Sequence, residues 1–590
     1  MINIVPIPTD DAGVATINTP DFPACELDSN ICVSIQNFGT DTLFSCDVSY
    51  AVNNGPFTTY NWTGMIPPQS DDTMCTQIGV FPFSIGDDLV VVANNPNGTA
   101  GAYIANDSIE VLNMDVSMYG TYGIPSDYPT ISAAINALNT YGVCDDVVFK
   151  LATGTYTEQL LLGPVLGMDS NATVTWTSST GSLTDVTVQF VNNIDSNYVV
   201  SLDEASWFRF KNITFKAMGS GLGRVFEIKN ESHNNILDSL RVVGLNTFST
   251  SDNLSLIYSD LSSDHENWFM NSSFEKGSYG INIQGAYNSF ESGIRIINND
   301  FIDNYYNSIS AWKMSGIEII GNTIHSISTY TAGIGIYCYY CDDGFDISYN
   351  HIYTEGNDAW PHTGIYTRLC EGSSLGVGYL TNNILTLGPA DGSSTNTFWG
   401  LYQLYTDICY VSNNTVTLQS GGLNSMAYRP AYGEYFFTNN NLFTNFGSGY
   451  AAYYQFGIPL DVTNNAYFSN GTNKLYFNGQ LYSTLLSFQN GSNLDTNSFY
   501  VNPNFSDTVA GKPCNDTLDN AGVSLPFVMD DFTHATRQES PDIGAREFIG
   551  LGSFSFSNDT ICDASYEVIS PELNTVWSVG RVTSHGESSG

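Results

Sequence analysis

An asparagine motif recurs seven times between residues 299 and 467, and it constrains the fold more than any other feature of the chain. Each copy reads Asn, one variable residue and a large apolar residue, and an irregular period of 23 to 33 residues is typical of a solenoid with loops of unequal length. Asparagine tolerates the left-handed backbone region, and stacked side-chain amides can form hydrogen bonds along the axis. Each copy therefore predicts one coil. The copies are Asn299-Asp300-Phe301, Asn322-Thr323-Ile324, Asn350-His351-Ile352, Asn383-Ile384-Leu385, Asn414-Thr415-Val416, Asn441-Leu442-Phe443 and Asn465-Ala466-Tyr467.

A second motif, glycine followed by an apolar residue and tyrosine, precedes three of these copies. Successive residues of a strand face opposite sides, so the apolar residue is expected in the core and the tyrosine on the outer face. This places Tyr337, Tyr366 and Tyr402 in one outer row, which is a candidate ligand-binding surface. The alternative interpretation is aromatic stacking that only stabilises the coils.

Cys341 and Cys370 occupy the same offset after the first two copies of this second motif. Neighbouring coils lie about 4.8 Å apart, which is within reach of a disulfide between stacked cysteines. We therefore predict a bridge between Cys341 and Cys370.

Residues 128–162 contain the predicted start of the solenoid. Ile131, Ala134, Ile135 and Leu138 follow helical spacing, and a helix there would cover the open end of the first coil. The strings "YPTISAAINALN" and "GTYTEQLLL" resemble the N-terminal cap and first coil of right-handed parallel β-helix proteins of the pectate-lyase-like class. The strings "LDNAGV", "DDFTHATR" and "SPDIGAREF" are similar to the closing segment of many secreted β-helix proteins. The resemblance implies an all-β fold with a right-handed parallel β-helix over residues 114–549.

Two further modules are expected on either side of the solenoid. Residues 1–113 alternate apolar and polar residues in short segments, as in an immunoglobulin-like β-sandwich of seven strands. There "SIQNFGTDTL", "WTGMIPP" and "FSIGDDLVV" resemble the CARDB modules of bacterial surface proteins. Residues 550–590 resemble the first strands of another immunoglobulin-like module that is incomplete, so we expect a section of a longer polypeptide. Four cysteines of the first module allow two bridges in three connectivities, which the sequence leaves open, namely Cys25, Cys32, Cys46 and Cys75.

Composition argues for an extracellular, cell-surface location. The net charge of −42 makes nucleic acid an unfavourable partner, and no run of 18 apolar residues predicts a transmembrane helix. The expected partners are polysaccharide, a cell or substratum surface, and neighbouring modules of the same polypeptide. A motif of Asp, Ser or Thr and an aliphatic residue resembles the O-glycosylation signal of gliding bacteria with type IX secretion. Its candidate glycosylation sites are Thr42, Thr73, Ser108, Ser239, Thr508, Thr517 and Thr560.

Known catalytic motifs of β-helix enzymes are incomplete in this sequence. Residues 154–158 match the opening motif of pectin methylesterases, but the later motifs of that family and the full motif set of polygalacturonases are missing. The best remaining cluster for a lyase or hydrolase is Asp342, Asp343, Arg368 and Glu371, in a groove around residues 338–371. A polar turn and a surface ion pair explain the same residues equally well.

No cofactor is predicted. The histidines lack metal-ligand spacing, while the many Asp and Asn oxygens in turns leave calcium binding open. The sequence favours a non-catalytic adhesive or structural section of a secreted surface protein that binds glycans or surfaces, with a gliding-motility adhesin as one specific form. The alternative is a polysaccharide lyase or glycoside hydrolase acting in a groove on the β-helix, since this architecture hosts both.

Overall fold

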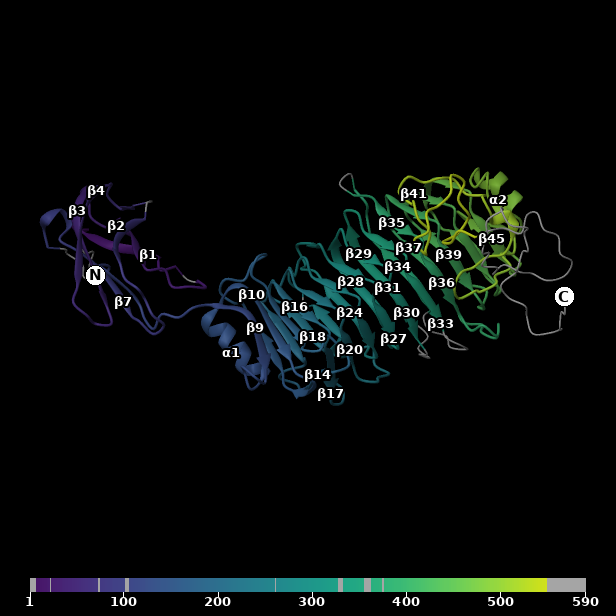
Figure 1. Ribbon diagram of the computed structural model, residues 1–590. Coiled ribbons are helices and arrows are strands. Elements are labelled where there is room, and N and C mark those ends of the chain that lie inside the picture. Colours follow the sequence, from purple (N-terminus) through teal and green to yellow (C-terminus); the bar gives the residue numbers. More distant parts are fainter. Residues whose placement is uncertain are drawn as a thin grey trace, which may run out of the picture. The chain divides into compact units, whose positions relative to one another are not determined.

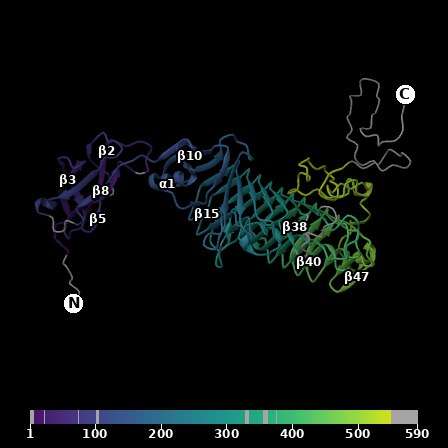
Figure 2. The same cartoon turned by 90° about the horizontal axis from the view of Figure 1, so that it is seen from below.

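The structure is a computed structural model that describes residues 7–21, 23–72, 75–100, 105–259, 261–326, 333–354, 362–373 and 376–548. The chain divides into two compact units, residues 1–151 with 164–176 and residues 152–163 with 177–590. Figures 1 and 2 show the helices and strands along the chain, coloured from the N-terminus to the C-terminus. Thr73, Thr560 and the expected module at 550–590 lie outside the described residues. Among the described residues, no helix is long and apolar enough to cross a membrane.

The first unit begins with a β-sandwich of two antiparallel sheets, as the alternating pattern predicted. One sheet pairs β1 and β5 with β2, and β6 also pairs with β2, while the other runs in the order β4, β3, β7, β8. The sandwich has eight strands instead of the expected seven, because a two-residue strand, β5, adds to one sheet. The strands are β1 Ala12–Thr19, β2 Asn30–Asn37, β3 Leu43–Val52, β4 Thr58–Ile66, β5 Ser70–Asp71, β6 Thr76–Val80, β7 Leu89–Asn94 and β8 Ser108–Val111.

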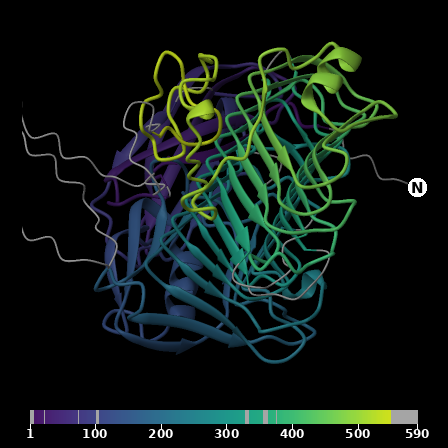
Figure 3. The ribbon, with the colours of Figure 1, turned by 90° about the vertical axis from the view of Figure 1, so that its right-hand side faces the viewer.

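A parallel β-solenoid of about 13 turns follows, which confirms the predicted fold class. Each coil contributes one strand to each of three parallel sheets, here called sheets I, II and III in chain order. Leu237, Phe274 and Ile309, one from each sheet, are fully buried in the common core. Figure 3 shows the coils stacked behind one another.

The strands of the solenoid are short, and their loops differ in length. Sheet I contains β16 Phe208–Lys211, β19 Ile236–Asp238, β22 Trp268–Met270, β26 Arg295–Ile297, β29 Glu318–Ile320, β32 Asp346–Ser348, β35 Gly378–Thr381, β38 Cys409–Ser412, β41 Glu434–Asn439 and β44 Ile458–Thr463, with β9 Met118–Ile124, β10 Val143–Leu151 and β13 Val174–Ser178 before them. Sheet II contains β11 Gly154–Thr157, β14 Val186–Val191, β17 Thr214–Met218, β20 Arg241–Val243, β23 Ser273–Glu275, β27 Asp300–Ile302, β30 Thr323–Ser326, β33 His351–Thr354, β36 Ile384–Leu387, β39 Thr415–Leu418, β42 Leu442–Asn445, β45 Ala466–Ser469 and β48 Phe499–Tyr500. Sheet III contains β12 Leu160–Leu162, β15 Val200–Asp203, β18 Phe226–Lys229, β21 Ile257–Ser259, β24 Tyr279–Gln284, β28 Asn307–Ser315, β31 Ile334–Asp342, β34 Thr363–Arg368, β37 Trp399–Leu404, β40 Met426–Ala431, β43 Tyr450–Tyr454, β46 Leu475–Phe477 and β47 Gln480–Tyr482, and β25 Glu291–Ser292 pairs with β28.

The seven asparagines of the motif form a continuous buried ladder at the turn between sheets I and II. In each step the backbone N–H and the side-chain Nδ2 of one asparagine both donate to Oδ1 of the asparagine on the next coil, at 3.0 to 3.1 Å. The same Nδ2 also donates to a carbonyl of the preceding coil at 2.8 Å, as from Asn414 to Leu380. Every ladder amide therefore joins three coils, which satisfies polar groups that would be costly to bury alone.

The left-handed residue of this turn is the one before the ladder asparagine, not the ladder asparagine itself as the sequence argument supposed. Asn382, Asn413, Asn440 and Asn464 have φ of +54°, +56°, +58° and +53°. The chain thus carries two adjacent asparagine rows with different roles. The seven ladder asparagines, which we call the inner row, form the hydrogen bonds between coils. Asn382, Asn413, Asn440 and Asn464, which we call the outer row, adopt the left-handed conformation of the bend.

A second polar ladder lies at the turn between sheets III and I. The backbone N–H of Ser232 donates to Asp264 Oδ1 at 2.9 Å, and that of Asp264 donates to Glu291 Oε1 at 2.8 Å. Further along, the backbone N–H of Cys341 donates to Cys370 Sγ at 3.3 Å. The two cysteines stack in register and serve as hydrogen-bonding members of their turns.

The predicted Cys341–Cys370 disulfide is therefore wrong. Both residues are free, fully buried thiols. Each sulfur also lies against a carbonyl of the preceding coil, Cys341 Sγ at 3.8 Å from Ala311 O and Cys370 Sγ at 3.5 Å from Cys338 O. A spacing compatible with a bridge does not suffice, because stacked side chains point in parallel and not at one another.

The disulfides of the first unit correct the expectation of two bridges among its four cysteines, because none of the three connectivities forms. Cys32 pairs with Cys75 inside the sandwich, with their Cα atoms 5.7 Å apart. Cys25 pairs outside it, with Cys144 in β10, and Cys46 is a buried free thiol. The bridge from Cys25 closes a separation of 119 residues and ties the loop after β1 to the first coil.

Short helices cover the core at both ends of the solenoid. The predicted helix is α1 Ile131–Tyr141, capped by the Thr130 side chain, and its four predicted apolar positions are buried. At the other end, α2 Leu485–Ser492 buries Phe488 against Tyr454 of the last coils, with ring centroids 5.9 Å apart. Capping both ends keeps apolar core residues of the terminal coils out of water.

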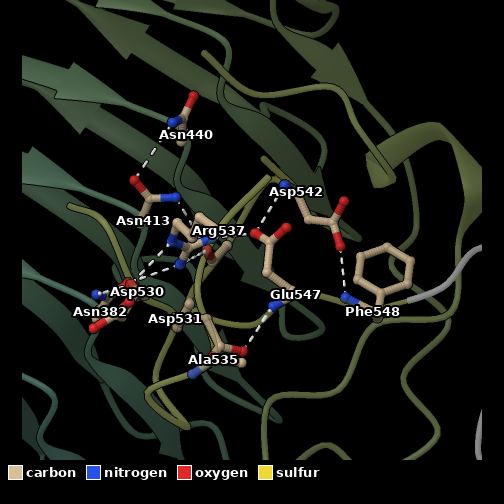
Figure 4. A network of polar contacts seen from close by, with 12 residues as sticks. Asn382, Asn413, Asn440, Asp530, Asp531, Ala535, Arg537, Asp542, Glu547 and Phe548 are labelled. Carbon is tan, nitrogen blue, oxygen red and sulfur yellow. Dashed lines mark hydrogen bonds and ion pairs between the residues drawn. The ribbon is translucent and has the colours of Figure 1, made fainter. Parts of the chain in front are cut away.

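The closing segment, residues 502–548, packs over the outside of sheets I and II and the turn between them. It hydrogen-bonds to the outer asparagine row, as from Asn440 Nδ2 to Val523 O at 2.7 Å, and Phe527 packs on Tyr410 with centroids 4.3 Å apart. Figure 4 shows its anchor, where the buried Arg537 guanidinium pairs with Glu547 at 2.5 Å and donates to Asn382 Oδ1 at 2.7 Å. One outer side of the later coils is thus covered by the chain itself.

Removing one ladder amide tests the role of the inner asparagine row. We expect Asn414→Ala to lower the free energy of unfolding by about 3 kcal/mol or more, because the Asn383 amide groups and the Leu380 carbonyl would each lose a buried partner. Urea unfolding followed by circular dichroism measures this. The matched control is Asn424→Ala, an exposed loop asparagine, for which a change within about 0.5 kcal/mol is expected. Equal effects of the two substitutions would contradict the ladder's role.

Buried carboxyl groups predict a pH dependence of stability. Burial raises the pKa of Asp495 and of Asp346 to about 6 and that of Asp542 to about 7. The unfolded value is about 3.9, so the stabilisation from these protonated groups is full below that pH and is lost as pH rises through the folded values. We expect the melting temperature to fall between pH 5 and pH 8, with a shallower fall in Asp495→Asn. A melting temperature that rises over this interval would refute the assignment.

Candidate functional site

The outer face of sheet III carries a row of polar and aromatic side chains at one register position. Tyr337, Tyr366 and Tyr402 pair in register on β31, β34 and β37, as the sequence predicted. The same row continues backward through Ser310, Asn282 and Tyr258. We call these six residues the tyrosine row. It spans the strands from β21 to β37, a distance of about 24 Å at the usual spacing of parallel strands.

The rings of the tyrosine row stack on one another. The centroids of Tyr337 and Tyr366 are 5.1 Å apart, and those of Tyr366 and Tyr402 are 4.5 Å apart with ring planes at 3°. Tyr337 and Tyr366 are half-buried, but Tyr402 is only 7% exposed, because the Arg429 guanidinium lies 4.4 Å from its ring centroid. Tyr337 and Tyr366 are therefore accessible to a ligand, whereas Tyr402 is covered by Arg429 and stacks on Tyr366.

A shallow groove of about 430 Å³ opens beside the earlier part of this row. Its floor comes from the outer faces of β24, β28 and β31, and the loop at residues 250–252 forms one wall. Trp312 and Tyr339 pair in register on β28 and β31, two residues after the members of the tyrosine row on these strands. Arg368 pairs with Tyr339 from β34, and its guanidinium lies 4.9 Å from the Tyr339 ring. The residues that line the groove are Thr250, Ser251, Asp252, Tyr279, Asn282, Gln284, Ser310, Trp312 and Tyr339.

The chemistry of the groove suits binding more than hydrolysis. Rings, amides and hydroxyls dominate the lining, and the indole Nε1 of Trp312 is buried without a hydrogen-bond partner. Glycoside hydrolysis uses two carboxyl groups, about 5 to 9.5 Å apart depending on the mechanism. Asp252 is the only carboxylate among the described lining residues, and it faces Arg224 at 4.0 Å. The described lining of the groove thus has the parts of a binding surface, with Asp252 as its one carboxylate.

The four residues of the alternative enzyme site are brought close only in part. Asp342 and Glu371 stack on successive coils, and the backbone N–H of Glu371 donates to Asp342 Oδ1 at 3.0 Å. Burial, with Glu371 and Asp343 nearby, raises the pKa of Asp342 to about 6. Arg368 instead lies over the Tyr339 ring and forms no ion pair with a described carboxylate. Asp342 and Glu371 of the predicted cluster therefore form a row of carboxylates, whereas Arg368 packs on the ring of Tyr339.

Calcium binding stays open, and the glycosylation sites remain predictions. Among the described residues, no group of three His, Cys, Asp or Glu side chains could hold a metal ion. Of the described glycosylation candidates, Ser108 and Thr517 are exposed, whereas Thr42, Ser239 and Thr508 are partly buried. The exposed pair is the more accessible to a modifying enzyme.

Trp312 and Asn282 are the site residues that sequence reasoning missed. A signal for Asn282 existed, because Gly280-Ile281-Asn282 is the glycine motif with asparagine in place of tyrosine, one strand before Ser310. No comparable signal marked Trp312. Its position follows from the pairing of β28 with β31, which sets it beside Tyr339 across a loop of variable length.

Comparison with known proteins finds only weak structural similarity. No protein-family model matches the chain, and no curated protein matches it. Among solved structures, the catalytic domain of a GH87 α-1,3-glucanase in complex with tetrasaccharides is similar at 11% identity and TM-score 0.22, covering 76% of this chain and 93% of that chain. The family 28 exopolygalacturonase of Yersinia enterocolitica is similar at 10% identity and TM-score 0.24, covering 79% and 98%. Likenesses this low leave the activity of the chain open.

Proposed function

We propose that this chain is a non-catalytic section of a secreted cell-surface protein that binds glycan chains along the outer face of sheet III. The observation that carries the proposal is the tyrosine row with its adjoining groove, where the half-buried rings of Tyr337 and Tyr366 lie beside a lining of rings, amides and hydroxyls. Aromatic faces pack on the apolar faces of sugar rings, while amides and hydroxyls take the sugar hydroxyls.

The repetition of the solenoid supports this function. Strand after strand presents side chains at the same height, so a polymer lying along the face can make many weak contacts at once. Linked weak contacts raise overall affinity without a deep site. A shallow groove is therefore sufficient for an adhesive role.

The covalent structure fits an oxidising, extracellular compartment. The Cys25–Cys144 and Cys32–Cys75 bridges are of the kind that persists outside the cytosol. A gliding-motility adhesin with type IX secretion is the specific form we favour, on the resemblance of the Asp-Ser/Thr motifs to the glycosylation signal. Intact-mass measurement of the native protein tests that form, and an unmodified mass would remove it.

Substitutions in the groove test glycan binding directly. We expect Trp312→Ala and Tyr339→Ala each to weaken binding of responsive glycans by about tenfold, because each removes a ring worth about 1.4 kcal/mol. Glycan-array screening followed by calorimetry measures this. Tyr119→Ala, which removes a half-exposed ring from β9, is the matched control and should bind normally. Wild-type binding by both groove variants would contradict the proposal.

A polysaccharide lyase or glycoside hydrolase is the second candidate, favoured by the raised pKa of Asp342 beside Asp343 and Glu371. If it is correct, acidic polysaccharides will be shortened by the wild-type chain, with or without calcium, and at least about a hundredfold more slowly by Asp342→Asn. Size-exclusion chromatography of the polymer provides the readout. We expect no cleavage by either protein, and cleavage that depends on Asp342 would replace the binding proposal with an enzymatic one.

A further inference from the structure

Three exposed aromatic rings stack on successive coils at the turn between sheets III and I. Tyr405, Tyr432 and Phe456 are 46%, 39% and 56% exposed. Their centroids are separated by 5.1 and 5.5 Å, with ring planes at 24° and 28°. We call these three residues the aromatic ridge. It lies outside the groove of sheet III, because none of its members lines that groove.

Each residue of the ridge is in the left-handed backbone region. The φ values of Tyr405, Tyr432 and Phe456 are +52°, +56° and +54°. This conformation is unfavourable for a bulky side chain, and residues held there cluster at functional sites. At the turn between sheets I and II the same need is met by Asn413 and Asn440. The chain therefore places aromatic residues on the ridge where asparagine would suit the backbone better.

The ridge contrasts with the covered aromatic stacks of the same coils. On sheet I, Tyr379 and Tyr410 are capped by Phe527 of the closing segment. The outer asparagine row is likewise bonded to that segment. No described residue covers the ridge to this extent, and its rings remain about half exposed. The ridge is thus an apolar surface without an occupant from the described chain.

A row of carboxylates runs beside the ridge, two residues after each of its first two rings. Glu371, Asp407 and Glu434 lie on successive coils, where the backbones of Glu371 and Asp407 form an isolated parallel β-bridge and the Glu434 backbone N–H donates to the Asp407 carboxylate. None of the three forms an ion pair with a described Lys, Arg or His. Burial and the neighbouring Glu371 and Glu434 raise the pKa of Asp407, as expected for negative charges gathered without a cation. The row repeats at the strand spacing of about 4.8 Å.

We propose that the aromatic ridge and this carboxylate row bind an extended polysaccharide that carries protonated amino groups. The rings pack on the sugar faces, and Glu371, Asp407 and Glu434 receive the ammonium groups. Stacked rings alone would bind any sugar polymer. A neutral polymer, however, would remove water from the carboxylates without supplying a cation to pair with them, which costs free energy. A flexible cationic peptide would pair the carboxylates but would not need three parallel rings.

This surface is separate from the glycan-binding face of sheet III, and the inference does not depend on that proposal. The sheet III face carries Arg368 and Arg429, which form no ion pairs with described carboxylates. A cationic polymer is disfavoured there and favoured at the ridge. The two surfaces therefore select ligands of different charge.

The test compares chitosan oligosaccharides with fully N-acetylated chitooligosaccharides of the same length. Calorimetry on the full chain at pH 6 and low salt should show binding of the amino form at least about tenfold tighter than that of the acetylated form. The variant Tyr405→Asn/Tyr432→Asn/Phe456→Asn removes the rings and keeps a residue that tolerates the left-handed backbone, so it should keep the wild-type melting temperature and lose chitosan binding. The variant Asp407→Asn/Glu434→Gln should lose it as well.

A charge-matched control separates the ridge from general attraction to an acidic chain. Asp195→Asn/Glu539→Gln removes two exposed carboxylates elsewhere and should bind chitosan as the wild type does. Chitosan binding that persists in the ring variant, or that falls equally in the control, would overturn the proposal in favour of non-specific polyelectrolyte attraction. Equal binding of the acetylated oligosaccharide would overturn the requirement for amino groups.

Discussion

The buried hydrogen bonds of the inner asparagine ladder are the interaction on which the solenoid depends. Each coil must turn sharply between sheets I and II, and the turn brings backbone N–H and carbonyl groups into an apolar interior. Unpaired, each of these groups would cost about 1–3 kcal/mol. Asparagine carries both a donor and an acceptor on a short side chain, so one residue per coil satisfies the turn below it and the turn above it. The register of the three sheets follows from this repeated contact.

Architecture and function are distributed over different turns and faces. Inward positions and the turn between sheets I and II hold the coils together, and the closing segment with its Arg537–Glu547 anchor covers that side of the later coils. The outer face of sheet III and the turn after it remain accessible. Their rings and arginines are free to differ between coils, because the asparagine ladder does not use them. A binding surface can therefore vary in chemistry without a change of fold.

Sequence reasoning predicted the elements that depend on local repetition. The seven coils of the motif, helix α1 and the register of Tyr337, Tyr366 and Tyr402 all follow from patterns within one or two coils. It failed where the outcome depends on side-chain direction. Cys341 and Cys370 have a spacing that permits a bridge, yet they point in parallel and remain thiols. It also missed the pairing of Cys25 with Cys144 across 119 residues, and the position of Trp312 beside Tyr339, which no motif marks.

Hydrogen–deuterium exchange with mass spectrometry, with and without a bound polysaccharide, measures the stability of the ladder and the location of the binding face in one experiment. If the ladder holds the coils, the amides of Asn322, Asn350, Asn383 and Asn414 will be among the slowest to exchange in the free protein. If sheet III is the binding face, the polysaccharide will add protection in β24, β28, β31 and β34 and leave sheet II unchanged. Fast exchange at the ladder, or ligand protection confined to sheet II, would contradict the account.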